Sequence, residues 1–330
     1  MTLPSSYLGT QDFEQASKRI APFVLRTPLI CSDYLSELAG FEIWLKLENL
    51  QKTGSFKLRG ASNRILQLSE TEKSRGIIAV SSGNHGRAVA FLSNKLGIRA
   101  IVVVCELCPE NKRAAMREYG AELIVHGQTQ DEAQAHADQL IAQHGYTWVD
   151  PFDDLQVIAG QGTLALEVMQ DMPDTDMIIT PLSGGGLLSG IALAAKNMAP
   201  SVSIVGASME IEPGMVRSLE AGKPVHVDEF PSLAGCITGA IGMNNQLTFN
   251  IVRDFMDKYV LVSEESLAPA LRRFAKAEGM IVEGGSVAAV IAALSPEVKE
   301  MSPKKAVIAI SGRNIDFDTF RTVTADNSAT

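Results

Sequence analysis

Lys57 is the residue of this 330-residue sequence whose surroundings point most clearly to chemistry. The stretch LENLQKTGSFKLRGA (47–61) predicts a helix that begins after Ser55, because apolar residues then recur with helical spacing from Leu58 to Leu68. With Ser55 as its N-cap, this helix carries Lys57 in its first turn, close to the buried face. Burial and the positive end of the helix both disfavour a charged amine there, which lowers its pKa. Such an amine can attack a carbonyl group and form a Schiff base. An ordinary surface lysine is the alternative that this pattern leaves open.

A polar cluster, SSGNHG at residues 81–86, separates an apolar strand (77–80) from an apolar helix. The start of a helix presents free backbone N–H groups, and together with neighbouring hydroxyls it can receive a carboxylate or a phosphate. The alternative is a well-capped helix in which Ser82 or Asn84 is the cap.

Two further polar clusters also follow apolar strands. The stretch PLSGGGLLSGIALAA (181–195) places glycines before a helix, so that the chain can approach a phosphate closely. It is not a P-loop, since GxxxxGK[ST] is absent, and it is not a full dinucleotide fingerprint, since Ser189 stands in place of the third glycine. A plain tight turn is the alternative. The other cluster, SGRN (311–314), follows the last apolar strand, and functional sites of parallel sheets gather at the carboxyl ends of the strands.

Apolar strands alternate with helical patterns along most of the chain, which predicts an α/β protein with parallel sheets covered by helices. Gly97 and Gly120 stand at two predicted helix ends, where glycine enters the left-handed conformation easily. The predicted strands are residues 42–47, 77–80, 100–104, 122–125, 177–180, 203–207, 259–262 and 306–310.

The composition is that of an ordinary globular chain, with 46% hydrophobic and 20% charged residues. A formal net charge of −9 argues against nucleic acid or an anionic membrane as the main partner. No apolar run reaches the roughly 20 residues of a membrane helix, and the N-terminal stretch lacks the pattern of a signal peptide. Four cysteines do not make a disulfide framework in a chain of this length. We therefore expect a reduced, cytoplasmic protein that acts on a small molecule.

Taken together, the motifs resemble the fold-type II pyridoxal phosphate enzymes, in particular the serine/threonine dehydratase group that also contains serine racemase. The resemblance runs through TPL (27–29), KTGSFKLRGA, SSGNHG, VIAGQGT (157–163), SGGGLLSGIA and SGRN. It implies a fold similar to the tryptophan synthase β chain, with two domains that each contain a helix-covered, mainly parallel twisted sheet. Residues 1–72 and 154–330 would form the large cofactor-binding domain, and the inserted residues 73–153 a small domain that closes over the substrate. Because relatives are usually dimers, we also expect a homodimer.

The resemblance also implies the cofactor, pyridoxal 5'-phosphate, and a role for each cluster. Lys57 matches the catalytic lysine that binds the cofactor covalently, and the glycine loop matches the one whose amides hold its phosphate. Residues 81–85 match the loop that receives the substrate carboxylate, in which Ser82 is the second acid/base of the racemase. The expected cofactor contacts are Phe56, Lys57, Asn84, Ser183, Gly184, Gly185, Gly186, Leu187, Glu283 and Ser311, and the expected substrate contacts are Ser81, Ser82, Asn84, His85 and Arg313.

Ser311 matches the serine that meets the ring nitrogen of the cofactor. A hydroxyl does not hold this nitrogen protonated as an aspartate would, so the ring is a weaker electron sink and loss of a β-leaving group is favoured. The expected activity is that of an ammonia-lyase that eliminates water from an L-β-hydroxy-α-amino acid, such as serine, threonine, 3-hydroxyaspartate or a hydroxyectoine-derived amino acid. Racemisation of the serine racemase type is the alternative. A nucleotide-binding module without catalysis, built on residues 183–190, is a second alternative.

Three features depart from the pattern of this group. Arg313 replaces the second glycine of the usual SGGN, and its planar guanidinium suits a second anionic group on the substrate. With VEGGS (282–286), Arg313 resembles the hydroxyectoine-utilisation and hydroxyaspartate dehydratase branch; an arginine that faces a surface acid is the alternative. The stretch SLAGCITGAIG (232–242) stands where relatives carry Ala-Asp-Gly. Ser208 and Gly214 stand where serine racemase has divalent-cation ligands, so no metal ligand is predicted and a bound cation is left open.

Overall fold

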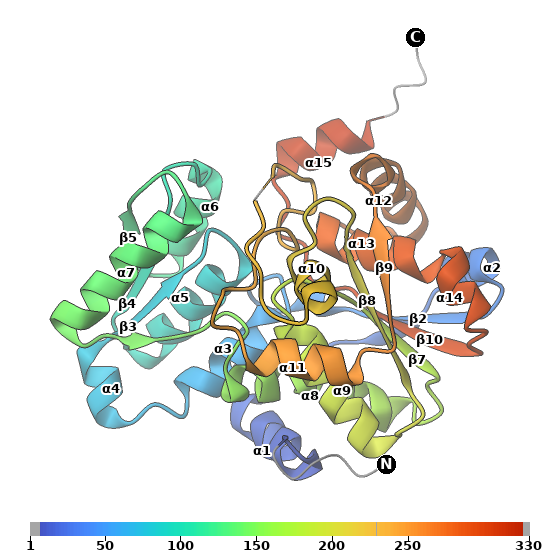
Figure 1. Ribbon diagram of the computed structural model, residues 1–330, viewed down its shortest axis with the longest axis horizontal. Coiled ribbons are helices and arrows are strands. Elements are labelled where there is room, and N and C mark those ends of the chain that lie inside the picture. Colours follow the sequence, from blue (N-terminus) through green and yellow to red (C-terminus); the bar gives the residue numbers. More distant parts are fainter. Residues whose placement is uncertain (1–6, 229, 326–330) are drawn as a thin grey trace.

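Two β-sheets organise the computed structural model, which describes residues 7–228 and 230–325 (Figure 1). The larger sheet has the strand order β1-β2-β10-β7-β8-β9, in which the β1–β2 pair is antiparallel and the other pairs are parallel. The smaller sheet has the order β5-β4-β3-β6 and parallel pairs throughout. The prediction of an α/β fold with mainly parallel sheets is therefore confirmed. The strands are β1 (Leu29–Cys31), β2 (Glu42–Lys46), β3 (Ile77–Val80), β4 (Ala100–Val104), β5 (Glu122–Val125), β6 (Thr147–Trp148), β7 (Met177–Pro181), β8 (Ser203–Met209), β9 (Lys258–Val262) and β10 (Lys305–Ala309).

Helices cover both faces of the larger sheet. The helices are α1 (Thr10–Ile20), α2 (Asp33–Ala39), α3 (Lys57–Ile65), α4 (Glu70–Arg75), α5 (Asn84–Leu96), α6 (Glu110–Glu118), α7 (Gln130–His144), α8 (Leu155–Asp171), α9 (Gly186–Met198), α10 (Gly214–Ala221), α11 (Leu247–Phe255), α12 (Glu264–Glu278), α13 (Gly284–Ala293), α14 (Pro296–Glu300) and α15 (Phe317–Thr324), with a short 3₁₀ helix, η1 (Glu48–Leu50). Ile179 and Val205 pack in one cluster with residues of α12 and α13, whereas their neighbours Ile178 and Ile204 pack in another with residues of α8 and α9. Consecutive strand residues point to opposite faces, so a strand buried on both faces must be apolar throughout.

Helix α3, which begins at Lys57, packs against α5 beside the smaller sheet and against α8 beneath the larger one. Its contact with α8 is a close approach of two backbones: a Cβ on Gly160 would lie 2.5 Å from the carbonyl oxygen of Arg59, and a Cβ on Gly60 would lie 2.4 Å from the side chain of Gln161. Helix α3 is thereby tied to the larger sheet. The strands of the smaller sheet lie between residues 77 and 148, and the expected domain bounds, with closure of residues 73–153, stay a prediction.

The structure differs from the sequence prediction at two short strands and at one helix cap. Strands β1 and β6 contain three and two residues, which is too short for a recognisable period. Ser55 as the N-cap of α3 is wrong, because Phe56 occupies that position. The backbone of Ser55 instead forms an antiparallel bridge with Gly312, which draws the start of α3 to the end of β10. Gly97 ends α5 in the left-handed conformation, with a φ of 67°, as predicted.

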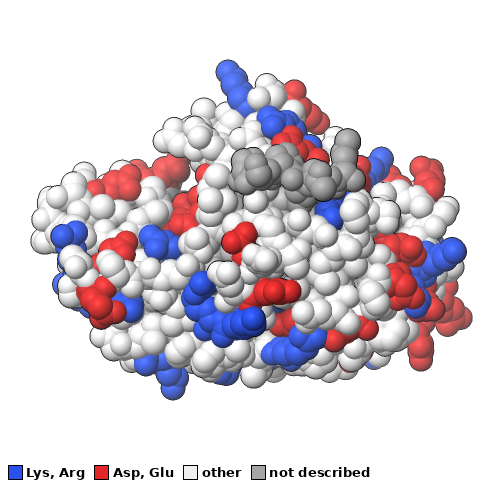
Figure 2. All heavy atoms as spheres, turned by 90° about the horizontal axis from the view of Figure 1, so that it is seen from below, with Lys and Arg blue, Asp and Glu red and all other residues white. Residues whose placement is uncertain are grey.

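The surface carries charges of both signs. On the face that Figure 2 shows, acidic and basic side chains are interspersed among uncharged ones. Within the described ranges, no helix has both the length and the apolar character that crossing a membrane requires.

Four charged side chains, Lys46, Glu48, Arg59 and Glu167, are buried together beside α3. Arg59 places Nη2 at 2.8 Å from Glu48 Oε1 and Nη1 at 2.7 Å from Glu167 Oε1. Lys46 Nζ lies 2.6 Å from Glu167 Oε2. Burial alone would raise the pKa of Glu48, but the charge of Arg59 and its hydrogen bond outweigh burial and lower it. Two positive and two negative charges thus neutralise one another in the interior and connect β2, η1, α3 and α8.

Replacing Arg59 by methionine would leave two buried carboxylates with one cation. We expect Arg59→Met to lower the free energy of unfolding by about 3–5 kcal/mol, the usual cost of removing one partner from a buried charge group. Urea denaturation followed by circular dichroism measures it. The control is Arg26→Met, which removes an exposed ion pair with Asp171 and should cost about 1 kcal/mol or less. Equal losses in the two variants would contradict a structural role for the buried group.

Candidate active site

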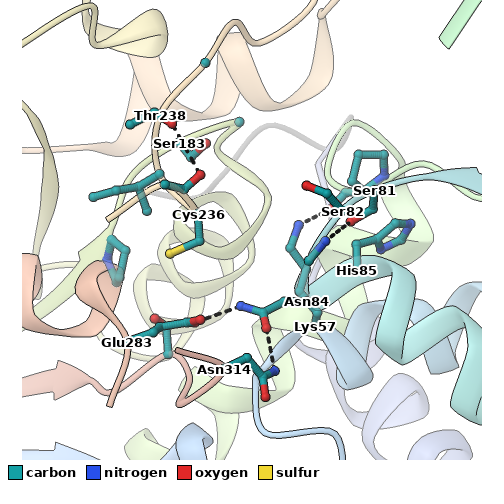
Figure 3. A pocket seen from close by; sticks show the side chains of 18 of the residues that line it. Lys57, Ser81, Ser82, Asn84, His85, Ser183, Cys236, Thr238, Glu283 and Asn314 are labelled. Atoms are coloured by element: carbon teal, nitrogen blue, oxygen red, sulfur yellow. Dashed lines mark hydrogen bonds between the residues drawn. The ribbon is translucent and has the colours of Figure 1, made fainter. Parts of the chain in front are cut away.

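The polar clusters of the sequence meet in one cavity of about 790 Å³. Its walls are formed by residues that follow β3, β7 and β10, together with the start of α3 (Figure 3). This is the arrangement expected when strands direct their carboxyl ends toward one site. The expected site residues that line the cavity are Phe56, Lys57, Ser81, Ser82, Asn84, His85, Ser183, Gly184, Gly185, Gly186, Leu187, Glu283 and Ser311.

Lys57 presents its amine to this cavity. Nζ donates a hydrogen bond of 2.6 Å to the backbone carbonyl of Pro151 and lies 5.5 Å from the centre of the Phe56 ring. Burial lowers the pKa of Lys57 to about 8, although the nearby charge of Asp150 acts to raise it. A large part of the amine is therefore uncharged at mildly alkaline pH, as a nucleophilic lysine requires.

The glycine loop forms an anion-binding wall of the cavity. Helix α9 begins at Gly186, and its cap residue Gly185 adopts a φ of 87° and offers no side-chain cap. The N–H groups of the first turn are thus free to bind an anion. Glycine is required next to them, because a Cβ on Gly184 would lie 2.4 Å from the ring of Phe152. The hydroxyl of Thr248 donates to the carbonyl of Gly184 at 2.7 Å and supports the loop from behind.

The loop after β3 forms a second wall with a free helix start. Helix α5 begins at Asn84 with Gly83 as its cap residue and no side-chain cap, so the alternative of a cap by Ser82 or Asn84 is wrong. His85 is buried, and its Nε2 lies 2.9 Å from the carbonyl of Val149. Burial lowers the pKa of His85 to about 4, and the charge of Lys57 adds to this effect. His85 is therefore neutral at pH 7, and it positions the loop by donating to Val149.

Asn84 and Glu283 meet across the cavity (Figure 3). Asn84 Nδ2 donates to Glu283 Oε1 at 2.7 Å. Burial raises the pKa of Glu283 to about 7, although the bond from Asn84 and the charges of Lys112 and Arg87 act to lower it. Near neutral pH this carboxyl group is thus close to the midpoint between its two forms.

Ser311 lies at the end of β10 beside Ser286, with the two hydroxyl oxygens 3.1 Å apart. Ser286 Oγ also donates to the carbonyl of Gly312 at 2.9 Å. Because that bond uses the single proton of Ser286, Ser311 is the donor in the contact between the two hydroxyls. Its proton can rotate from Ser286 to another acceptor placed beside it. Ser286 was not among the predicted site residues, although it belongs to the VEGGS stretch.

The structure does not bring Arg313 into the cavity. Its side chain is exposed and does not line the cavity, and its backbone N–H donates to the carbonyl of Gly54 at 2.9 Å. The expectation that Arg313 binds substrate therefore has no support in the geometry. Two other cations line the cavity instead, Arg87 on α5 and Lys112 on α6. Arg87 could have been found, because it follows Asn84 by three residues and so shares its face of the helix.

Cys236, from the stretch that departs from the family pattern, also lines the cavity (Figure 3).

Ser208 and Gly214 stand where serine racemase has divalent-cation ligands. Ser208 is buried in β8 and Gly214 begins α10. Among the residues that the structure describes, no three His, Cys, Asp or Glu side chains gather in a way that could hold a metal ion.

The cavity fits the cofactor that the resemblance implies. Its donors stand on different walls: free amides at the start of α9 suit a phosphate, the Ser311 hydroxyl suits a ring nitrogen, and the Asn84 amide suits a ring oxygen. Between them lies an amine whose pKa is lowered to about 8 and which can bond to an aldehyde.

Comparison with known proteins agrees with this geometry. The family model of pyridoxal-phosphate dependent enzymes matches residues 20–312. A Sinorhizobium fredii protein provisionally named threonine dehydratase is 43% identical over 318 residues, 96% of each chain. An L-threonine ammonia-lyase of Thermotoga maritima is 41% identical over 306 residues, which are 93% of this chain and 75% of the relative. The crystal structure of serine racemase from Dictyostelium discoideum has a TM-score of 0.87 at 38% identity and covers 94% of this chain and 99% of its own.

The amine of Lys57 should react with an acylating reagent at a lower pH than an ordinary lysine. Competitive labelling of the cofactor-free protein with acetic anhydride, read by peptide mass spectrometry, should give a midpoint near pH 8, against the ordinary lysine value of 10.5. The exposed lysines of the same chain are the internal reference. A Lys57 midpoint that coincides with theirs would contradict the desolvation argument.

Glu283 should make the protein less stable as the pH rises. Its pKa is about 7 in the folded chain and near 4.5 when unfolded, so the folded state binds the proton more tightly. Its contribution is present below pH 4.5 and is lost as the pH rises through 7, by up to ~3 kcal/mol. Glu283→Gln should remove this loss in urea denaturation of the cofactor-free protein at pH 5 and pH 8. Glu14→Gln, at an exposed position of α1, is the control, and an unchanged pH dependence in Glu283→Gln would refute the assignment.

Proposed function

The chain belongs to the pyridoxal-phosphate dependent enzymes, and on this premise we propose that it is an ammonia-lyase of the threonine dehydratase type. It eliminates water from an L-β-hydroxy-α-amino acid, and the product hydrolyses to a 2-oxo acid and ammonia. The observation that carries the proposal is the position of Lys57, whose amine, with a pKa of about 8, lies in the cavity that two free helix starts also line. The relative named for threonine dehydratase, at 43% identity, and the L-threonine ammonia-lyase, at 41%, support this reading.

In this proposal each wall of the cavity has a separate task. The amides of the glycine loop and α9 bind the cofactor phosphate, and Ser311 donates toward the ring nitrogen. The amides and hydroxyls from Ser81 to Asn84 bind the carboxylate of the amino acid. When bound, pyridoxal phosphate withdraws electrons from the α-carbon of the amino acid.

Lys57 is the proposed base. Its lowered pKa leaves the amine able to accept the α-proton near neutral pH, and an acid–base group is most effective when its pKa lies near the working pH. The bond from Nζ to the carbonyl of Pro151 orients the amine within the cavity. His85, being neutral and bonded to Val149, does not compete for this proton.

Racemisation is the second candidate, because the serine racemase structure is similar over 94% of this chain and Ser82 lines the cavity. If Ser82 serves the face opposite Lys57, the enzyme would return a proton there. Ser82→Ala would then abolish formation of the D-isomer and leave elimination largely intact. Chiral chromatography of recovered substrate distinguishes the two activities.

The proposal is tested by release of 2-oxo acid from serine, threonine and the stereoisomers of 3-hydroxyaspartate. The holoenzyme should turn over at least one of them, and Lys57→Ala should lower kcat by at least about 10³-fold, since it removes both the covalent anchor and the base. Lys52→Ala is the control, because this exposed lysine lies in the same segment. Turnover that survives in Lys57→Ala, or a wild-type protein that forms no 2-oxo acid from any of these substrates, would overturn the proposal.

A further inference from the structure

Four side chains form a continuous chain of hydrogen bonds along one wall of the cavity. Arg87 Nη1 donates to Asn314 Oδ1 at 3.1 Å, and Asn314 Nδ2 donates to Asn84 Oδ1 at 2.6 Å. Asn84 Nδ2 then donates to Glu283 Oε1 at 2.7 Å. Figure 3 shows Asn84 between Glu283 and Asn314. Arg87 and Asn84 belong to α5, which packs beside the smaller sheet. Asn314 follows β10 of the larger sheet, and Glu283 directly precedes α13, which covers that sheet. The chain of hydrogen bonds therefore also connects the two sheets.

Only one direction of donation is compatible with the residue at the start of this chain. A guanidinium group has donors and no acceptor, so Asn314 must turn its carbonyl oxygen toward Arg87. Its NH₂ group then faces Asn84 and also the carbonyl of Thr53, to which it donates at 2.9 Å. Asn84 must in turn direct its carbonyl toward Asn314 and its NH₂ toward Glu283. One N–H of Asn84 is used by Glu283, and the second is left to donate.

We propose that Arg87 is a positioning residue that, through Asn314, holds the amide of Asn84 as a hydrogen-bond donor toward the ring oxygen of the cofactor. The inference rests on the proposed function, since it assigns the partner of Asn84 as pyridoxal phosphate. A flipped Asn84 would present its carbonyl oxygen to the ring oxygen, and two acceptors would then face each other.

The burial and the charge of these groups support this role. Arg87 is half-buried, burial lowers its pKa, and its side chain donates to Asn314. At the other end, a protonated Glu283 could donate and would no longer require an N–H from Asn84. The positive charges of Arg87 on α5 and Lys112 on α6 act against the burial that raises the Glu283 pKa to about 7, and therefore favour its acceptor form. Arg87 thus favours the same direction of donation, from Arg87 toward Glu283, at both ends of the chain of hydrogen bonds.

The test compares substitutions at residue 87 that differ in their capacity to donate. Arg87→Lys keeps a donor-only cation, Arg87→Met removes the donor, and Arg87→Glu replaces it with an acceptor. We expect Arg87→Met to raise the Kd of the cofactor-free protein for pyridoxal phosphate by about tenfold, Arg87→Glu to raise it further, and Arg87→Lys to stay within about threefold of wild type. The absorbance of the bound cofactor changes with pH, and the midpoint of this change should also shift from its wild-type value. The shift should be smallest in Arg87→Lys, larger in Arg87→Met and largest in Arg87→Glu. Lys95→Met, at an exposed position on the same helix, is the control.

Asn314→Asp tests the middle of the chain of hydrogen bonds. An aspartate can still accept from Arg87, yet it cannot donate to Asn84 or to the carbonyl of Thr53. The proposal therefore predicts weaker cofactor binding in Asn314→Asp, and Arg87→Met, which keeps the bond to Thr53, separates this effect from the loss of that bond. Wild-type affinity in Arg87→Met or in Asn314→Asp would overturn it. So would an Arg87→Met effect confined to KM for substrates with a second carboxylate, which would make Arg87 a substrate ligand. These affinities and spectra are measured without turnover, so a protein that forms no 2-oxo acid would refute the proposed function and still leave the role of Arg87 measurable.

Discussion

The partial burial of one lysine side chain is the constraint on which the site depends. Lys57 lies at the first residue of α3, where the cavity wall keeps its pKa near 8. Arg59, two residues further along the helix, holds that position, because its guanidinium is paired with Glu48 and Glu167 in the interior. Fully paired charges therefore support an amine nearby whose pKa is lowered to about 8. The four buried charges around Arg59 are tolerated because each has a partner of opposite sign. The amine of Lys57 has a backbone carbonyl as its hydrogen-bond partner, so burial lowers its pKa.

Much of the fold could be predicted from the sequence, because strands buried on both faces must be apolar throughout. Ile77–Val80 and Ala100–Val104 were predicted with the bounds that the structure has. The predicted positions of Lys57, the glycine loop and Ser311 along the chain also follow from local pattern, since each stands where an apolar element begins or ends. Ser55 shows the limit of such patterns: its hydroxyl suits a helix cap, but its backbone pairs with Gly312, a residue 257 positions away that no local rule considers.

Arg313 and Arg87 illustrate why the remainder of the site could not be predicted in the same way. Both are arginines next to family motifs, and Arg313 was predicted to bind substrate because it departs from the family pattern. The direction of a side chain after a strand depends on how the following turn is held, and at Arg313 the backbone bond to Gly54 leaves the side chain exposed. Arg87 lies on a regular helix, where spacing from Asn84 determines direction. Helical positions near a motif are thus more predictable than positions in the turn that completes it.

The contact between α3 and α8 has a consequence for how the two halves of the molecule can shift. Their backbones touch at Gly60 and Gly160, where even one added methyl group would clash, so these helices cannot slide past each other. Between α3 and α5 the contact joins apolar side chains, among them Leu58 and Val89. Side chains can change rotamer at smaller cost than touching backbones can separate, so α3 is held more rigidly to α8 than to α5, the helix that begins at Asn84.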